Sequence, residues 1–458
     1  MSVTIVLYFC SVKQKIYNLM KKICTSLFLV AILIALSASS LRAQYLVSSD
    51  SVFNAGTPMT GHIWGYTFGD FYDKGHADAL NRGNNNQYSG IPQDRTAFQI
   101  RRIYFGYDYN FNKKFSSELL LAAEDNFPAG NPPSNAATPA GDQLLDSKLA
   151  FYIKLANIRW KNVWKGTDLV VGQQATPAFG GSSEKVWGYR SIERTITDIR
   201  RTPSYDLGVG LQGTFDPKTK NYGYNLLIGN GSSAKPEGDD YKMFYGDVWA
   251  KFLNQKLIVD LYGDYNRLKW TGALHNSRQM WKLFAGYNTA PLSVGLEGFI
   301  NNLKQDLTAY KISDGAPVVL DNVASGASVF VNGDIIKNTL RFFARYDYYT
   351  PTNKVDNSMY SKYTSGTNGY NDNSYSSAGV LTGPNKEGDM TYRQSFITLG
   401  LDYMPTKNVH IMPNIWYSHY ATQLSDDLNN TINGDLASKA KGDYDLVYRI
   451  TFYYTFGK

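Results

Sequence analysis

The sequence predicts an all-β fold, a transmembrane antiparallel β-barrel of about 16 strands with one loop folded into the lumen. Three observations favour it: a strongly alternating last strand, a leader at the other end of the chain, and an aromatic-rich composition. Of 458 residues, 14% are aromatic and 40 are glycine. The mean hydropathy of -0.34 is low for a helical membrane protein. A barrel wall fits, because only every second residue meets lipid and aromatic residues line both interfaces.

The last strand shows the alternation most clearly. Apolar or aromatic residues occupy one set of alternate positions: Tyr444, Leu446, Tyr448, Ile450, Phe452, Tyr454 and Phe456. Polar residues occupy positions of the other set: Asp445, Arg449, Thr451 and Thr455. Because successive side chains of a strand point to opposite faces, one face suits acyl chains and the other suits water.

The opposite end of the chain predicts a secretory signal peptide over residues 20–43. It begins with basic residues, continues with an uncharged and mostly apolar run at 25–38, and offers a cleavage site between Ala43 and Gln44. The run is shorter than the roughly 20 residues that a membrane-spanning helix needs. Residues 1–19 precede the usual start of such a peptide, which predicts that translation begins at Met20; a longer two-part leader is the alternative.

Charge and cysteine usage exclude several classes of function for the remaining chain, 44–458, which we expect to form a single outer-membrane barrel domain. Both cysteines, Cys10 and Cys24, fall in the segment predicted to be removed, so disulfides and thiol chemistry are excluded. Basic residues just before Cys24 argue against a lipid-attachment site. Removal of the leader leaves 41 basic and 39 acidic residues. This balance gives no electrostatic support for nucleic-acid binding.

The same alternation recurs along the chain and predicts the individual strands. We expect them at 62–72, 96–111, 115–125, 148–160, 168–174, 205–215, 222–229, 242–252, 256–268, 279–289, 292–303, 324–335, 339–349, 392–403, 408–420 and 444–456. Most reach the roughly 9 to 11 residues that a tilted strand needs to cross the hydrocarbon layer. Strands of soluble sheets cluster nearer 5 to 6 residues. The alternative is a large secreted β-sandwich or β-helix.

Two of these strands carry specific predictions about which side chains face which way. In 96–111 the apolar positions change phase at Arg101-Arg102, which predicts a β-bulge there. In 148–160 the pattern places four apolar residues on one face and three polar or aromatic residues on the other: Leu149, Phe151, Ile153 and Leu155 against Lys148, Tyr152 and Lys154.

The connections between strands fall into two length classes. Short ones, rich in Pro, Asn, Asp or Lys, are expected at the periplasmic rim: 110–114, 216–220, 254–255, 290–291 and 405–406. Long polar ones are expected outside: 74–95, 126–147, 175–204, 304–323, 350–391 and 421–443.

One long connection differs from the others, because residues 184–201 mix apolar side chains with charges. This character predicts a segment that packs against the barrel wall and narrows the lumen. Its basic residues, the candidate pore constriction, outnumber its acids Glu184, Glu193 and Asp198: Lys185, Arg190, Arg194, Arg200 and Arg201. The predicted constriction is therefore net positive. The alternative is a surface helix with solvated charges.

Short motifs in this part of the chain are similar to those of the phosphate-selective porin O and P family. They are Arg101-Arg102, Gly172-Gln173 followed by residues 177–180, Arg190 to Arg194, and the segment 205–209. The resemblance implies a sixteen-stranded, homotrimeric channel in the outer membrane of a Gram-negative bacterium, conducting anions such as phosphate. By position, it also implies that Arg190 and Arg194 line the pore. The partners would be outer-membrane lipid and small polar or anionic solutes, with no cofactor.

The inward positions of the predicted strands carry charges of both signs. The basic candidates for the lumen wall are Arg102, Lys148, Lys154, Arg341, Arg345 and Arg449, with Lys251 and Lys282. The acids are at least as frequent: Asp108, Glu118, Glu124, Asp206, Asp247, Asp260, Asp264, Glu297, Asp347, Asp402 and Asp445. Opposed charges would set up a transverse field that filters solutes by size and polarity. For most of these wall charges, pairing with a neighbour across strands is favoured over contact with solute.

A passive diffusion channel is the function that these features favour, and no enzyme chemistry is expected. Five histidines show no metal-ligand spacing, and no Gly-x-Ser-x-Gly motif is present. Asp426-Asp427 with Asn429-Asn430 would suit calcium, but a solvated loop is the favoured interpretation. The alternatives are a sugar-permeable porin, a plugged barrel that acts through surface loops in binding or adhesion, and a lipid-modifying enzyme.

Overall fold

The computed structural model divides the chain into two units, Met1–Gln44 and Tyr45–Lys458, and the described residues all belong to the second. They are 60–79, 82, 87–88, 91–124, 149–200, 203–237, 240–271, 274–311, 313–353, 359–365, 392–422 and 442–457. The predicted upstream extension and signal peptide lie outside this part of the chain. So do the candidate calcium ligands at 426–430 and the predicted loop 126–147.

Seventeen strands of the described chain form one antiparallel sheet. They are β1 (Thr60–His76), β2 (Thr96–Asn110), β3 (Phe115–Glu124), β4 (Tyr152–Trp164), β5 (Thr167–Ala175), β6 (Tyr205–Thr214), β7 (Tyr222–Gly229), β8 (Met243–Phe252), β9 (Leu257–Thr271), β10 (Leu274–Asn288), β11 (Leu292–Lys311), β12 (Pro317–Ile336), β13 (Leu340–Thr350), β14 (Tyr360–Ser365), β15 (Tyr392–Thr406), β16 (Val409–Thr422) and β17 (Asp443–Phe456).

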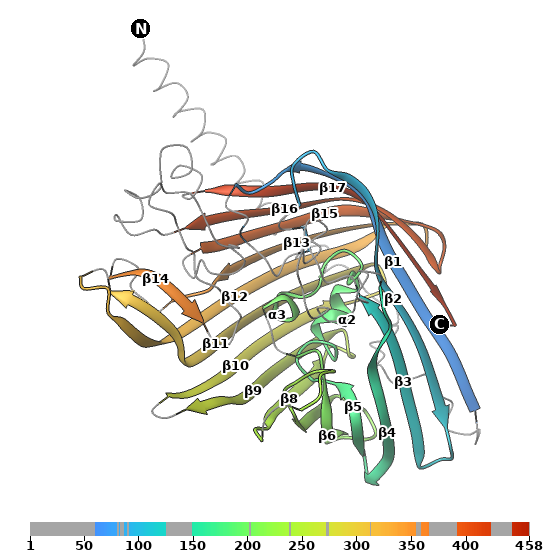
Figure 1. Cartoon of the computed structure of the whole chain (residues 1–458). Coiled ribbons are helices and arrows are strands. Elements are labelled where there is room, and N and C mark those ends of the chain that lie inside the picture. Colours follow the sequence, from blue (N-terminus) through green and yellow to red (C-terminus); the bar gives the residue numbers. More distant parts are fainter. Residues whose placement is uncertain are drawn as a thin grey trace. The chain divides into compact units, whose positions relative to one another are not determined.

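Sixteen of these strands close into a barrel (Figure 1). Each pairs with the next along the chain, except that β13 pairs directly with β15. The last strand, β17, returns to β1, with Tyr453 opposite Phe68. The remaining strand, β14, pairs with the far end of β11. The predicted fold class is confirmed.

The two faces of the wall differ as the alternation predicts. In β17, Tyr448 and Ile450 are 49% and 47% exposed, whereas Asp445, Arg449 and Thr451 are at most 3% exposed. The exposed side chains are apolar and point away from the interior, as a lipid-facing surface requires. Among the described residues, no helix is long and apolar enough to cross a membrane.

The predicted bulge in the second strand is confirmed. Phe68 of β1 lies opposite Arg102, and the next residue, Gly69, lies opposite Ile100. Arg101 is therefore the extra residue of the ladder. The insertion turns both arginines into the barrel, where Arg101 is 2% and Arg102 is 7% exposed.

The facing of Leu155 in β4 was predicted wrongly. The register passes from Leu120 opposite Leu155 to Leu121 opposite Ile153, so Lys154 is an extra residue here. This second bulge lets Lys154 and Leu155 both point inward, each 8% exposed. Leu155 joins an apolar cluster with Leu120, and Lys154 pairs with Glu124.

The predicted long connection 304–323 is also corrected, because most of it is strand. β11 runs on to Lys311 and β12 begins at Pro317, with Leu307 opposite Leu320 after an irregularity in the register. β14 pairs with the same part of β11 and falls within the predicted loop 350–391. Leu307 and Ala309 are fully buried in this three-stranded extension, and their burial explains why the hairpin continues past the barrel rim.

Most short connections lie where the sequence predicts them. The links between β2 and β3, β8 and β9, and β10 and β11 span only a few residues. Asn254 and Gln255 adopt the left-handed backbone region, with φ of 57° and 64°, which Asn tolerates better than most residues. The predicted turn at 405–406 is displaced, because β15 continues through Thr406.

Candidate functional site: a constriction formed by the inserted loop

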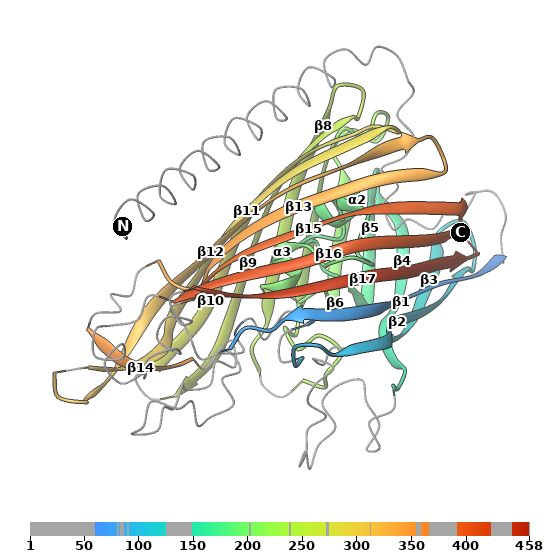
Figure 2. The same cartoon turned by 90° about the horizontal axis from the view of Figure 1, so that it is seen from above.

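The connection between β5 and β6 folds into the barrel. It contains two short helices, α2 (Ser183–Trp187) and α3 (Ile196–Ile199). Figure 1 shows both inside the ring of strands, and Figure 2 gives the same arrangement in a view turned by 90°. α2 lies beside β10, β11 and β12, and α3 lies beside β12. The predicted packing of this segment against the wall is confirmed.

An apolar core inside the lumen holds one side of the loop. Trp187 and Ile192 are fully buried and form a cluster with inward-facing wall residues. The Trp187 ring lies 5.2 Å from that of Phe330 and 6.3 Å from that of Phe343, centroid to centroid. Aromatic contacts of this kind stabilise a packed core by about 0.5–1.5 kcal/mol each beyond area burial. The loop is therefore a fixed part of the barrel interior.

Three wall arginines bind backbone carbonyl groups of the loop. Arg101 donates to the carbonyl of Ser191, Arg345 to that of Arg194 at 2.5 Å, and Arg449 to that of Ile192 at 3.0 Å. Each arginine also has a polar partner on the wall itself, namely Asp70, Asp347 and Asn414 respectively. Such hydrogen bonds satisfy carbonyl groups that have no partner in regular secondary structure.

Wall carboxylates bind the loop at its two helices. Ser182, the residue before α2, donates its hydroxyl to Asp260. Thr197 at the start of α3 donates its hydroxyl to Glu297 at 2.7 Å and its backbone N–H to the same oxygen at 3.3 Å. These hydrogen bonds to carboxylates are stronger than bonds between neutral groups, so they fix the start of each helix to the wall.

The other side of the loop carries a charged cluster. Arg190 pairs with Glu184 and with Asp198, the latter at 2.8 Å, and Arg194 lies 3.8 Å from Asp198. The side chains of Arg190, Glu184 and Arg194 remain 14%, 24% and 26% exposed. Because these residues lie inside the barrel, the exposed surface faces lumenal space.

A second charged cluster on the wall lies opposite the first. Glu124 of β3 accepts from Arg102 of β2 at 2.5 Å and from Lys154 of β4. Arg190 is close enough to Arg102, Glu124 and Lys154 to interact with their charges. We call the two clusters together the constriction: Arg102, Glu124, Lys154, Glu184, Arg190, Arg194 and Asp198.

The charged residues of the loop shift one another's pKa values, as expected in a dense cluster. Burial alone would lower the pKa of Arg190, but the carboxylates of Glu184 and Asp198 outweigh burial and raise the pKa above its ordinary value. Burial would raise the pKa of Asp198, but Arg190 and Arg194 outweigh it and lower that pKa. For Arg194, burial and the nearby Arg102 lower the pKa. Asp198 therefore keeps its negative charge at the centre of the loop cluster.

The five residues predicted to form the constriction lie in different places. Arg190 and Arg194 belong to the charged cluster just described. Lys185 lies on α2 and is partly buried. Arg200 points to the opposite side of the loop, with its guanidinium 3.8 Å from the centre of the Tyr349 ring. Arg201 lies outside the described residues.

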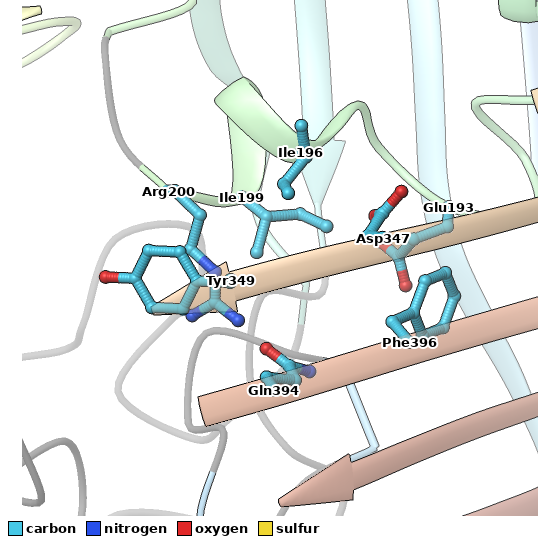
Figure 3. Close-up of a pocket in the computed structure, with 8 residues that line it drawn as sticks. All are labelled: Glu193, Ile196, Ile199, Arg200, Asp347, Tyr349, Gln394 and Phe396. Carbon is cyan, nitrogen blue, oxygen red and sulfur yellow. The ribbon is translucent and has the colours of Figure 1, made fainter. Parts of the chain in front are cut away.

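Arg200 lines a small pocket between α3 and the wall (Figure 3). The pocket is bounded by Glu193, Ile196, Ile199, Arg200, Asp347, Tyr349, Gln394 and Phe396. Its volume is about 10 Å³, room for no more than about one water molecule. It is a packing seam between loop and wall and too small for a solute.

The predicted wall residues also separate into groups. Arg102 and Lys154 face the loop across the constriction, while Arg345 and Arg449 hold the loop backbone. Arg341 pairs with Asp334 on the neighbouring strand. Lys148 lies outside the described residues. Pairing across strands, which is favoured for most of these charges on the sequence, is what the structure shows for Arg102, Lys154 and Arg341.

Sequence reasoning missed a second connection that enters the lumen. Tyr88, between β1 and β2, is fully buried and donates its hydroxyl to Asp70 at 2.5 Å. Its ring lies 5.6 Å from that of Trp416. Its neighbour Ile91 is 1% exposed in the same cluster. The sequence carries no signal for this contact, because Arg101 and Thr451 also supply the inward-facing Asp70 with polar partners.

Within the described ranges, no group of three or more His, Cys, Asp or Glu side chains is arranged to hold a metal ion. No protein-family model matches the chain. A search of curated proteins finds no match either.

Solved structures with a similar fold do exist. The outer membrane channel DcaP of Acinetobacter baumannii aligns with a TM-score of 0.51 at 13% identity, over 88% of this chain and 99% of that one. OmpF of Salmonella typhi, in complex with daunomycin, aligns with a TM-score of 0.49 at 11% identity, over 88% and 99%. OmpT of Vibrio cholerae gives 0.48 and 13%, over 88% and 99%. At such low identity the likeness to DcaP shows a shared fold and nothing finer.

Proposed function

We propose that the protein is a porin, a passive diffusion channel of a Gram-negative outer membrane for small hydrophilic solutes. The lipid-facing outer surface, the predicted signal peptide and the similarity in fold to an outer membrane channel support the location. One observation carries the function: Arg190, Glu184 and Arg194 of the loop keep exposed surface inside the barrel, beside the buried charges of the β2–β4 wall. Charges that keep exposed surface inside a barrel need water beside them.

The charge balance of the constriction favours anions weakly. Four basic residues, Arg102, Lys154, Arg190 and Arg194, face three acidic ones, Glu124, Glu184 and Asp198. Because these charges are paired at close range, their electric fields largely cancel within the constriction. Phosphate selectivity, which the family resemblance implies, would need more unpaired basic residues than the described constriction offers. We therefore propose a size-limited pore with a modest preference for anions, and the homotrimer stays a prediction from the resemblance.

The reversal potential in a potassium chloride gradient across a planar bilayer tests this proposal. The unmodified protein is expected to pass chloride somewhat better than potassium. Arg190→Ala combined with Arg194→Ala removes two of four cations and leaves three acids, so the chloride-to-potassium permeability ratio should fall by roughly twofold or more, to below one.

The matched control is Arg159→Ala. Arg159 also faces inward and pairs with an aspartate, Asp168 at 3.1 Å, but it is not part of the constriction. Its loss should change the permeability ratio much less. An unchanged ratio in the double variant would remove the selectivity proposal while leaving the channel itself intact.

A plugged barrel that acts through its surface loops is the second candidate. It is favoured by the burial of Tyr88 and Ile91, because they add a second packed connection to the lumen. Absence of ion current from well-folded protein would favour this candidate over the channel.

A further inference from the structure

Three aromatic rings follow one another along the inner face of β1. Trp64, Tyr66 and Phe68 occupy alternate positions, so their side chains share a face. The ring centroids of Trp64 and Tyr66 lie 6.3 Å apart with planes inclined by 12°. Those of Tyr66 and Phe68 lie 6.5 Å apart at 7°. These spacings match two residues of strand rise, so the rings form a strip of nearly uniform orientation.

The strip lies flat against the barrel wall. A Cβ atom on Gly106 of β2 would fall 2.3 Å from the indole ring of Trp64. The ring therefore covers the glycine, with one face on the wall and the other turned to the lumen. Tyr66 lies against Tyr104 in the same way, with centroids 4.5 Å apart. Glycine at position 106 is what allows the indole to approach the backbone so closely.

The two ends of the strip differ in accessibility. Phe68 is 1% exposed, and the guanidinium of Arg101 covers its ring at 5.0 Å. Trp64 and Tyr66 are only partly buried. Tyr453 of β17, also partly buried, stands edge-on to Tyr66 at 6.1 Å. The accessible part, which we call the aromatic strip, consists of Trp64, Tyr66 and Tyr453.

Polar groups border the aromatic strip on both sides. The indole N–H of Trp64 donates to Asp108 at 2.9 Å. At the other side, the hydroxyl of Tyr66 interacts electrostatically with Arg190 and Glu184 of the constriction. The strip therefore leads along the wall to the charged constriction.

We propose that the aromatic strip is a binding site for saccharide rings in transit. This inference rests on the proposed channel function and names a class of solute for it. A sugar ring has apolar C–H faces and a rim of hydroxyl groups. It therefore matches flat rings with carboxylates and a guanidinium at their edges. Simple inorganic ions and flexible chains gain nothing from a flat apolar surface, so the strip adds a preference that the charges alone do not supply.

Block of the ion current by a neutral malto-oligosaccharide in a planar bilayer tests the proposal. The sugar should block the unmodified channel at lower concentration than a polyethylene glycol of equal mass. Trp64→Ala and Tyr66→Ala should each raise the half-blocking concentration by about fivefold or more. Tyr66→Phe keeps the ring and should stay within about twofold of the unmodified protein.

The matched control is Trp281→Ala. Trp281 also covers a glycine, Gly263, with a Cβ-to-ring distance of 2.8 Å, but it lies on the outer face and is 49% exposed. Its loss should leave sugar block unchanged.

Three results would overturn the inference while the channel function stands. They are a conducting pore that sugar and polymer block equally, sugar block unaffected by Trp64→Ala and Tyr66→Ala, and block by aromatic anions but not by sugars. Absence of any ion current would instead overturn the channel function on which the inference rests.

Discussion

At the scale of single residues, the inward-facing arginines have two different tasks. Arg101, Arg345 and Arg449 bind loop carbonyl groups and are at most 3% exposed, so solute does not reach them. Arg190 and Arg194 keep exposed surface. Sequence position alone does not separate the two groups, because both place a guanidinium on the inside of the barrel.

Removal of one of these buried arginines should destabilise the barrel strongly. Arg345→Met leaves Asp347, 4% exposed, without its guanidinium, and leaves the carbonyl of Arg194 without its donor. Truncating one member of a buried ion pair typically costs about 3–5 kcal/mol. Urea unfolding in detergent measures the loss, and Arg345→Met combined with Asp347→Leu should recover part of it. A single variant as stable as the unmodified protein would contradict the assigned contacts.

The lowered pKa of Asp198 predicts how ion preference depends on pH. A group whose folded-state pKa is lowered contributes stability that is present above its unfolded pKa, about 4, and is lost as pH falls through the lower folded value. Asp198 should therefore stay charged from neutral pH to below about pH 4, the ordinary pKa of an aspartate. The pore should become more anion-preferring only at the lower pH where Asp198 is protonated. Reversal potentials of the unmodified protein and Asp198→Asn measure this. Equal reversal potentials of the two proteins near neutral pH would contradict this prediction.

At the scale of elements, the inserted loop is predictable in outline and its contacts are not. Charges mixed with Trp187, Ile192 and Ile196 predict a segment packed against a wall. The residues that receive it, Phe330 and Phe343 among them, point inward from strands whose outer face is also apolar. The alternation of apolar and polar residues becomes weaker where the lumen is filled, because both faces of the strand are then buried or lipid-facing.

The same limit explains the other differences between prediction and structure. The strand pattern located all sixteen barrel strands, since lipid on one side and polar groups on the other enforce the period of two. It missed the second bulge at Lys154, because one inserted residue leaves little trace in a short apolar run. It also missed the inward packing of Tyr88, since nothing in a polar connection tells a core tyrosine from an exposed one.

Loosening the loop should widen the pore. Trp187 is fully buried between the loop and wall, and Trp187→Ala should cost about 3–5 kcal/mol of stability and release the loop from its apolar core. The size of polyethylene glycol that still enters the pore, read from its effect on conductance, should then increase. The lipid-facing Trp281→Ala is the control. An unchanged size limit would show that the backbone contacts alone hold the loop.

At the scale of the whole molecule, the two faces of the barrel differ in polarity. Its outer face exposes residues such as Leu283 at 55% and Leu296 at 52%, which only acyl chains solvate well. Its inner face carries paired charges, aromatic rings and two packed connections. The proposed function depends on one property of this interior: a continuous water-filled path beside the loop, past Arg190 and Glu184.

Single-channel recording in a planar bilayer tests that property most directly. A water-filled path predicts stable, ohmic current steps in potassium chloride, in proportion to salt concentration and larger in a variant that lacks residues 183–200. Folded protein that inserts into the bilayer and carries no current, while the loop-deleted variant conducts, would show that the loop closes the barrel and would contradict the channel.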